Sequence, residues 1–320
     1  MRLKLIIFGV FVLCGGLGLM LMTSSKTVAK QLVAKPYVTP WLQSGQLGNQ
    51  LHEIATTLAY AWDNNVEAIF PELNRNDLNI PINRERIFFR LNRSPLPRPI
   101  AHTFDQFTHF EKIEIPKQSD LLLRGYYQTW KYYDHHRDKL VEVFAPSPEE
   151  LKHLTTKHAA LLEHPCTVGV HVRTFNKHWC TLSNPFVDID YYEKAMDLFP
   201  EDALFVVFSD RINWTKHHFQ KIKRPMIFIE DQDHIEDFFL MSMLKHNIIC
   251  NSSFSWWAAY LNPNPHKKVV TPSHFLFPNE YAKVANASLP DWHIIEIPLD
   301  HHFPEDMNLY DARSKSIDTQ

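Results

Sequence analysis

The chain has 320 residues, of which 45% are hydrophobic, enough for about two globular domains with a sizeable core. Its 33 basic and 36 acidic side chains leave a formal net charge of −3, which argues against a nucleic-acid-binding surface. The 19 histidines and four cysteines show no zinc-ligand spacing, so we expect no metal site.

An uncharged apolar run lies close to the N-terminus. Arg2 and Lys4 precede it, and residues 5–22 carry no charge, a length near the lower limit for a helix that crosses a bilayer. We therefore expect a cytoplasmic tail (1–4), a transmembrane signal anchor (5–22) and a stem (23–36). A cleaved signal peptide is the alternative.

Apolar periodicity then predicts a strand at 37–42, a helix at 51–64 and a short strand at 121–123, whereas residues 71–118 show no clear pattern. From residue 148 strands and helices alternate regularly, which predicts an α/β fold with a doubly wound sheet. The expected elements there are a helix from Pro148, strands at 167–172, 204–208, 226–229, 248–250 and 268–271, and helices at 190–199, 214–223, 235–245 and 253–260. A loose tail is expected at 299–320.

Glycine is rare outside the apolar run, and two glycines stand in the segment 45–50, between the first strand and the first helix. Such a loop can bring backbone N–H groups close to a substrate at a helix N-terminus, although an ordinary turn is the alternative. Glu53, a few residues later, is a candidate for the base that takes a proton from an acceptor hydroxyl.

Five aromatic residues stand within 124–133. Aromatic faces suit sugar rings, so Tyr126 and Tyr127 are candidate acceptor contacts, and Gln128 could orient a hydroxyl. An aromatic interface between domains is the alternative.

The apolar strand at 167–172 leads into Arg173, whose planar fork of donors suits a pyrophosphate. His171 alternates with it on the same side of the strand. In this fold the carboxyl ends of the strands point to the ligand site. The alternative for His171 is a buried histidine whose hydrogen bonds are made within the core.

Two further strand exits carry polar residues. Ser209 and Asp210 follow one strand, and Asp210 could accept hydrogen bonds from a ribose or a base amino group. Asn251, Ser252 and Ser253 open a helix after the other strand and could seat a phosphate. Helix capping by the serines is the alternative.

Cys14 lies in the apolar run, which leaves three cysteines in the remaining chain, so at least one of them has no partner within the chain. A disulfide between Cys166 and Cys180 is compatible with an oxidising lumen, although the pairing does not follow from the sequence.

In their order and content, these stretches resemble the α-1,2-fucosyltransferase family. The resemblance covers roughly residues 40–298 and rests on five segments, of which the last is the most specific: 45–51, 125–133, 171–173, 208–210 and 245–262. It implies a GT-B-like arrangement of two Rossmann-like domains facing a cleft. The acceptor-side domain would span 37–150 and the GDP-sugar-binding domain 151–298.

The resemblance implies an inverting glycosyltransferase that moves L-fucose from GDP-β-L-fucose to a galactose hydroxyl of a glycan, in α-1,2 linkage. It implies no metal or other cofactor, and a single-pass type II protein of the Golgi membrane with a lumenal catalytic domain.

The same resemblance implies roles for individual residues. Arg173 would hold the donor β-phosphate, His171 and Asp210 would contact the nucleoside, and Asn49 would face the sugar and the leaving group. The pyrophosphate would lie on the helix start formed by Ser252, Ser253, Phe254 and Ser255.

The chain departs from the family pattern at three places. Residues 174–176 stand where a second arginine and an aspartate are usual, Gln46 stands where arginine is common, and Arg211 follows Asp210 in place of a second acid. Another donor or linkage, or a catalytically silent relative that binds glycan or GDP-sugar, therefore stays open.

Overall fold

The computed structural model describes residues 35–42, 45–106, 110, 112–114, 119–175, 178, 180, 183–277, 288–299 and 303–308. The predicted cytoplasmic tail and anchor, with most of the stem, lie outside the described residues. No helix among the described residues is both long and apolar enough to cross a bilayer.

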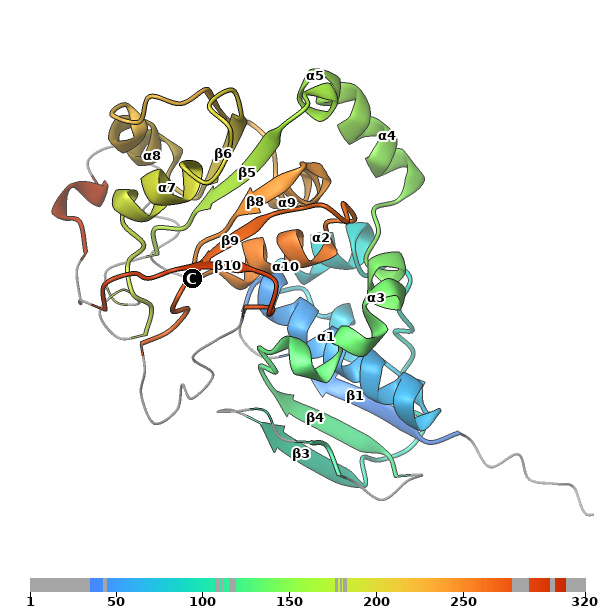
Figure 1. Cartoon of the computed structure of the whole chain (residues 1–320). Helices are drawn as coiled ribbons and strands as arrows, with labels where there is room; N and C mark the ends of the chain where they lie inside the picture. Colours follow the sequence, from blue (N-terminus) through green and yellow to red (C-terminus); the bar gives the residue numbers. More distant parts are fainter. Residues whose placement is uncertain are drawn as a thin grey trace, which may run out of the picture. The chain divides into compact units, whose positions relative to one another are not determined.

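Two parallel sheets form the framework (Figure 1). The smaller sheet has the strand order β2-β1-β4-β3. Its strands are β1 (Tyr37–Trp41), β2 (Glu67–Ala68), β3 (His102–Gln106) and β4 (Leu121–Gly125). The sequence did not predict β3, because this strand is mostly exposed and so carries no apolar pattern.

The larger sheet has the order β10-β9-β8-β5-β6-β7, which confirms the predicted α/β fold with parallel strands. Its strands are β5 (Thr167–Val172), β6 (Leu204–Ser209), β7 (Met226–Phe228), β8 (His246–Ile248), β9 (Val269–Pro272) and β10 (His293–Ile295). Every residue of β5 is buried, which explains its continuous apolar sequence.

From residue 148 on, the helices follow the predicted alternation with shifts of a few residues at their ends, whereas the helices at 80–86 and 137–143 were not predicted. They are α1 (Leu47–Asn64), α2 (Ile80–Arg86), α3 (Arg137–Val143), α4 (Pro148–Lys157), α5 (Ala159–Glu163), α7 (Ile189–Met196), α8 (Ile212–Phe219), α9 (His234–Met243) and α10 (Ser253–Leu261). Short 3-10 helices are η1 (Pro71–Asn74), η2 (Trp130–Tyr132), η3 (Asp134–His136) and η4 (Glu305–Asn308). The predicted start of α4 at Pro148 is confirmed, and Ser147 caps it, because its hydroxyl accepts a hydrogen bond from the Glu150 amide at 3.1 Å.

Helix α1 begins four residues earlier than the periodicity predicts. The amides of Asn49 and Gln50 already donate to the Gln46 carbonyl at 3.0 and 3.2 Å. Residues 47–50 of the glycine segment therefore form the first helical turn. Apolar spacing misses this turn because its glycine and amide residues are not apolar.

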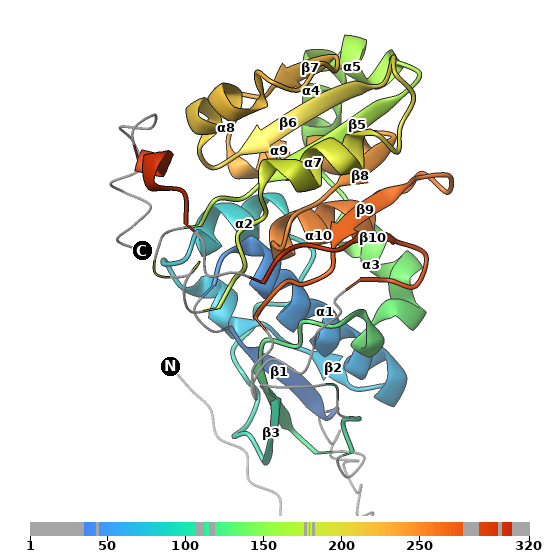
Figure 2. The same cartoon turned by 60° about the vertical axis from the view of Figure 1, so that its left-hand side comes forward.

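One hydrophobic cluster is shared by the two sheets. It joins β1 and β4 of the smaller sheet and the neighbouring helix α1 to the helices α9 and α10 beside the larger sheet. A second cluster fills the opposite face of the larger sheet, between β5 and β6 and the helices α7 and α8. Helix α1 accordingly packs on β1 and also contacts α10, and α10 lies beside it in Figures 1 and 2.

Two minor expectations differ from the structure. Cys166, Cys180 and Cys250 are free thiols, so the Cys166–Cys180 disulfide that the sequence left open is not formed. Residues 303–308, inside the predicted loose tail, pack on the larger sheet: Met307 is fully buried, and Asp306 accepts a hydrogen bond from the Trp214 indole at 3.1 Å. Met307 and the partly buried Phe303 supply the apolar contacts of this segment, too few to give a periodicity in the sequence.

Candidate functional site

The strand order of the larger sheet reverses between β5 and β8, which pair through Val170 and Ile248. In doubly wound folds, ligands bind beyond the carboxyl ends of the strands at such a reversal. Arg173 directly follows β5, and residues 249–252 connect β8 to α10. The structure thus brings two of the four predicted stretches to one place.

The start of α10 has no side-chain cap. Ser252 is the N-cap residue, and its hydroxyl makes no capping hydrogen bond. Ser253 directs its hydroxyl to Asn49 at 3.0 Å, and the buried Ser255 donates to the Ser252 carbonyl at 3.3 Å. Helix capping by the serines is therefore not their role here, and the first-turn N–H groups keep the positive end of the helix for an anion.

Arg173 is oriented by a neighbouring carboxylate. Its Nη1 lies 3.1 Å from Oδ2 of Asp210, and its guanidinium stacks over the Phe175 ring at 5.4 Å. Oδ1 of Asp210 accepts hydrogen bonds from the backbone amide and the hydroxyl of Thr174, at 3.0 and 3.1 Å. One third of the Arg173 side chain is exposed, so its remaining donors can reach a ligand.

Asp210 is bound by neighbouring protein groups. Its carboxylate is 9% exposed and is shared between Arg173 and Thr174. Ser209 also bonds locally, because its hydroxyl oxygen accepts from the Arg211 amide and the Thr215 hydroxyl, at 3.0 and 2.8 Å. Nucleoside or donor contacts by these two residues stay predictions.

His171 joins the end of β5 to the start of α10. Nδ1 lies 3.3 Å from the Cys250 thiol, and the ring lies 5.4 Å from that of Phe254. Burial, aided by the Arg173 charge and opposed by Asp210, lowers the pKa of His171 to about 4. The ring is therefore neutral at physiological pH and adds no charge to an anion site.

Asn251 is also placed at this edge but is 3% exposed. Its amide nitrogen donates to the Pro185 carbonyl at 2.7 Å, whereas its Oδ1 has no hydrogen-bond partner among the described residues. An unpaired buried acceptor is costly. A donor-binding role for Asn251 stays a prediction.

Asn49 links the first helical turn to two other predicted stretches. Its Oδ1 accepts hydrogen bonds from the Ser253 hydroxyl at 3.0 Å and from the Gln128 amide at 2.8 Å. Gly48 lies against the same helix start, because a Cβ there would lie 2.5 Å from the Ser253 carbonyl carbon and 2.6 Å from the Phe254 nitrogen. Glycine at 48 therefore permits a close approach of α1 to α10.

Gln50 supports this turn and was missed by the sequence reasoning. Its amide donates to the carbonyls of Gly45 and Leu78 at 3.1 and 2.9 Å, and its oxygen accepts from Asn83 at 2.8 Å. Asn83 in turn contacts Nε2 of His234 at 2.8 Å. A polar network across four separate segments leaves no periodic signal that could have found it.

The aromatic stretch lies largely inside the protein. Tyr127 and Tyr133 are 1% and 0% exposed, and the Tyr127 hydroxyl donates to the Phe104 carbonyl at 3.0 Å. This placement agrees with the alternative of an aromatic interface. Gln128 contacts Asn49 and therefore lies at the candidate site, whereas Tyr126 is half-buried and its acceptor contact stays a prediction.

Glu53 is 2% exposed and lies one helical turn after Asn49, on the same face of α1. His52 beside it was not predicted. Its Nδ1 lies 2.8 Å from the Tyr133 hydroxyl, and its ring lies 5.1 Å from that of Trp256. Burial lowers the pKa of His52 to about 3, so a neutral histidine joins α1, the aromatic stretch and α10.

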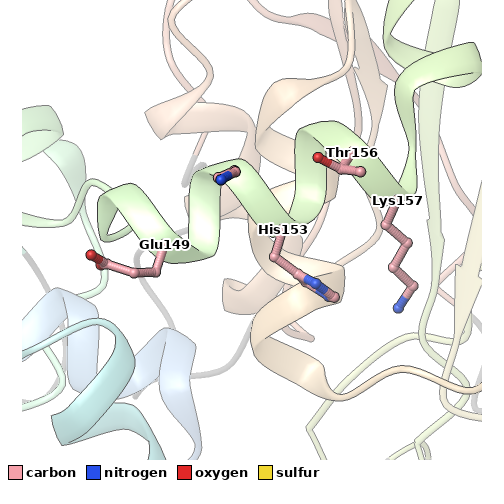
Figure 3. Close-up of a pocket in the computed structure, with 5 residues that line it drawn as sticks. Glu149, His153, Thr156 and Lys157 are labelled. Carbon is pink, nitrogen blue, oxygen red and sulfur yellow. The ribbon is translucent and has the colours of Figure 1, made fainter.

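A depression on α4 lies away from this edge (Figure 3). Its lining residues are Glu149, Lys152, His153, Thr156 and Lys157. His153 and Lys157 contact Glu236 of α9 at 2.7 and 3.2 Å. The depression therefore follows the ion pairs that join α4 to α9, and we assign it no ligand.

The sequence was compared with known families and proteins. A family model described as glycosyl transferase family 11 matches residues 16–296. The O-antigen biosynthesis glycosyltransferase WbnK of Escherichia coli is 27% identical, with 68% of this chain and 74% of the relative covered. An E. coli α-1,2-colitosyltransferase is 28% identical (53% and 61% covered), and galactoside α-(1,2)-fucosyltransferase 2 of Mus musculus is 29% identical (80% and 77% covered).

The predicted Golgi membrane location is contradicted. Two of these relatives are from a bacterium, which has no Golgi, and no described helix meets the requirements for a membrane span. The prediction rested on residues 5–22, which lie outside the described residues.

Proposed function

The chain belongs to glycosyl transferase family 11 and is a glycosyltransferase; from this we propose that it transfers L-fucose from GDP-β-L-fucose to a galactose hydroxyl of a glycan. We further propose an α-1,2 linkage, formed with inversion at the anomeric carbon. The α-1,2-fucosyltransferases among its relatives support the donor and the linkage.

One observation at the site carries the proposal: Arg173, held by Asp210, and the uncapped start of α10 follow adjacent strands of one sheet. The leaving group of the transfer is GDP, whose pyrophosphate gains negative charge as the sugar departs. A guanidinium and a helix N-terminus both stabilise that charge. In this proposal they take the place of a metal ion.

The acceptor side of the proposal lies along α1. Asn49 would face the donor sugar, because it contacts Ser253 of the proposed pyrophosphate seat. Gln128, bonded to the same amide oxygen, would position the acceptor together with the half-buried Tyr126. Glu53, one turn along the helix, is our candidate for the base that deprotonates the acceptor hydroxyl.

The test is a transfer assay on the full chain. The protein is incubated with GDP-fucose and a panel of galactose-terminated acceptors, and GDP release is measured. We expect acceptor-dependent release that Arg173→Ala lowers at least about 100-fold. Arg90→Ala is the matched control, because Arg90 is exposed and, within the described part of the chain, donates to backbone carbonyls at 143–146 and stacks on Phe89, none of which is a proposed site residue. Equal rates for the two variants would contradict the proposal, and NMR of the product identifies the linkage.

A second candidate is transfer of another sugar, because one relative is named an α-1,2-colitosyltransferase. The departures at 174–176 are compatible with a changed sugar pocket. Failure of GDP-fucose in a protein that still binds GDP would favour this candidate, and a panel of other nucleotide sugars would then identify the donor.

A further inference from the structure

Three residues with metal-binding side chains meet at the far end of α1. Asp63 lies in the last turn of α1, and His135 and His136 belong to η3. Nε2 of His135 lies 2.9 Å from Oδ2 of Asp63, and Nε2 of His136 lies 2.7 Å from Oδ1. One ligand atom from each residue lies within 4.8 Å of the other two.

The ligand set matches a known coordination chemistry. Two imidazole nitrogens and a carboxylate bind divalent transition metals, and zinc sites with three protein ligands leave a position for water. Ligand atoms of a tetrahedral zinc site lie about 3.3 Å from one another. The three side chains therefore reach this geometry through shifts of less than about 1 Å each.

The surroundings favour a bound ion over a simple surface ion pair. Trp62 packs edge-on against the His136 ring at 5.1 Å, which restricts its orientation. His136 is 16% exposed, whereas His135 and Asp63 are 49% and 44% exposed, so an ion held there would have one open side. A depression lined by residues 134–139 adjoins the cluster and gives access to water.

We propose that Asp63, His135 and His136 bind one divalent transition-metal ion, with Zn²⁺ as the probe, and that this ion fastens the end of α1 to η3. The spacing of ligands along the chain hides this site, because Asp63 precedes His135 by 72 residues. Helix α1 has 18 residues and is about 27 Å long, so the cluster lies far from Asn49 in its first turn. The proposal is thus independent of the proposed sugar transfer.

The test is binding of Zn²⁺ to the metal-free full chain, measured by calorimetry, with Co²⁺ absorption as a report on nitrogen ligands and geometry. We expect one equivalent to bind and to raise the Tm, because a ligand of the folded state stabilises it. Asp63→Asn and His136→Ala should each weaken binding about tenfold or more. Asp63 lies in the last turn of α1 and His136 in the short helix η3, both at the protein surface. We therefore expect both variants to fold, and circular dichroism checks this.

His153→Ala is the matched control, because His153 also pairs with a carboxylate, that of Glu236, but belongs to no group of three metal-ligating side chains among the described residues. This variant should bind Zn²⁺ like the original protein. Binding that is absent in the original protein, or equally strong in all variants, would overturn the proposal. Affinity should fall at acidic pH, because imidazole ligands must be deprotonated.

Discussion

The hydroxyl of Ser253 donates a hydrogen bond to Oδ1 of Asn49 over 3.0 Å, although 204 residues separate the two in the chain. The same oxygen accepts from Gln128 at 2.8 Å. One amide thus holds together the first turn of α1, the start of α10 and the segment after β4. Any ligand seated on α10 would lie against this junction.

Asn49→Ala should reduce kcat/KM for the proposed transfer by about tenfold or more, because it releases Ser253 and Gln128 together. The stability cost should be small, about 1 kcal/mol, since hydrogen bonds contribute modestly to folding. Kinetics and urea unfolding measure the two effects. Asn74→Ala, which removes an exposed contact to the Arg93 carbonyl, should leave the kinetics unchanged. If Asn49→Ala and Ser253→Ala combine additively, the two residues do not act together.

Gly48→Ala adds only one methyl group, yet it should impair activity strongly. The added methyl group would lie 2.5 Å from the Ser253 carbonyl carbon, and backbone cannot yield as a side chain does. We expect a loss of about 1–3 kcal/mol in stability, with displacement of the α10 start. Gly169→Ala is the comparison, because its methyl group would meet only side-chain atoms, at 3.1 Å or more. An unimpaired Gly48→Ala enzyme would show that α1 and α10 need not approach closely.

Asp210→Asn should lower turnover while the protein stays folded. The substitution removes the charge that orients the Arg173 guanidinium at 3.1 Å. Because Arg173 is proposed to stabilise the leaving group, kcat should fall at least about tenfold, and KM for the donor should change less. Asp197→Asn is the control, since Asp197 is 79% exposed and lies 3.6 Å from its arginine partner. A change confined to KM would mean that Asp210 serves donor binding alone.

Stability should decrease as the pH falls below neutrality. Burial lowers the pKa of His171 to about 4 and that of His52 to about 3, from an ordinary value of 6.5. The unfolded chain therefore takes up protons first. The contribution of the two neutral histidines to folding stability is complete above about pH 7. It is lost as the pH falls through 6.5 towards the pKa values of the folded state. By pH 5 each histidine should cost about 2 kcal/mol.

Urea unfolding at pH 7.5 and pH 5 measures this loss. His52→Phe keeps an aromatic ring and should reduce the loss by about 2 kcal/mol, whereas replacement of the exposed His266 should not change it. The same loss in His52→Phe as in the original protein would show that His52 is not buried in its neutral form.

The sequence by itself determined the order along the chain of five strands of the larger sheet and of the helices between them, because parallel strands buried on both faces require continuous apolar runs such as Thr167–Val172. It did not predict the edge strand β10, whose three residues are mostly exposed. It also determined which strand exits carry Arg173 and the serines of α10, since polar residues after a buried strand stand out locally. The edge strand β3 and the buried Met307 left no such pattern.

Only the tertiary structure decided what these residues contact. It paired Asp210 with Arg173, placed Tyr127 in the core, and joined Asn49 to Ser253 and Asp63 to His135. These contacts connect residues far apart in the chain. The contacts of Asn49 and Asp63 depend on how α1 packs, and that of Asp210 depends on the pairing of β5 with β6. Local periodicity reports which face of an element is apolar, but not which distant side chain meets it, because that choice follows from packing.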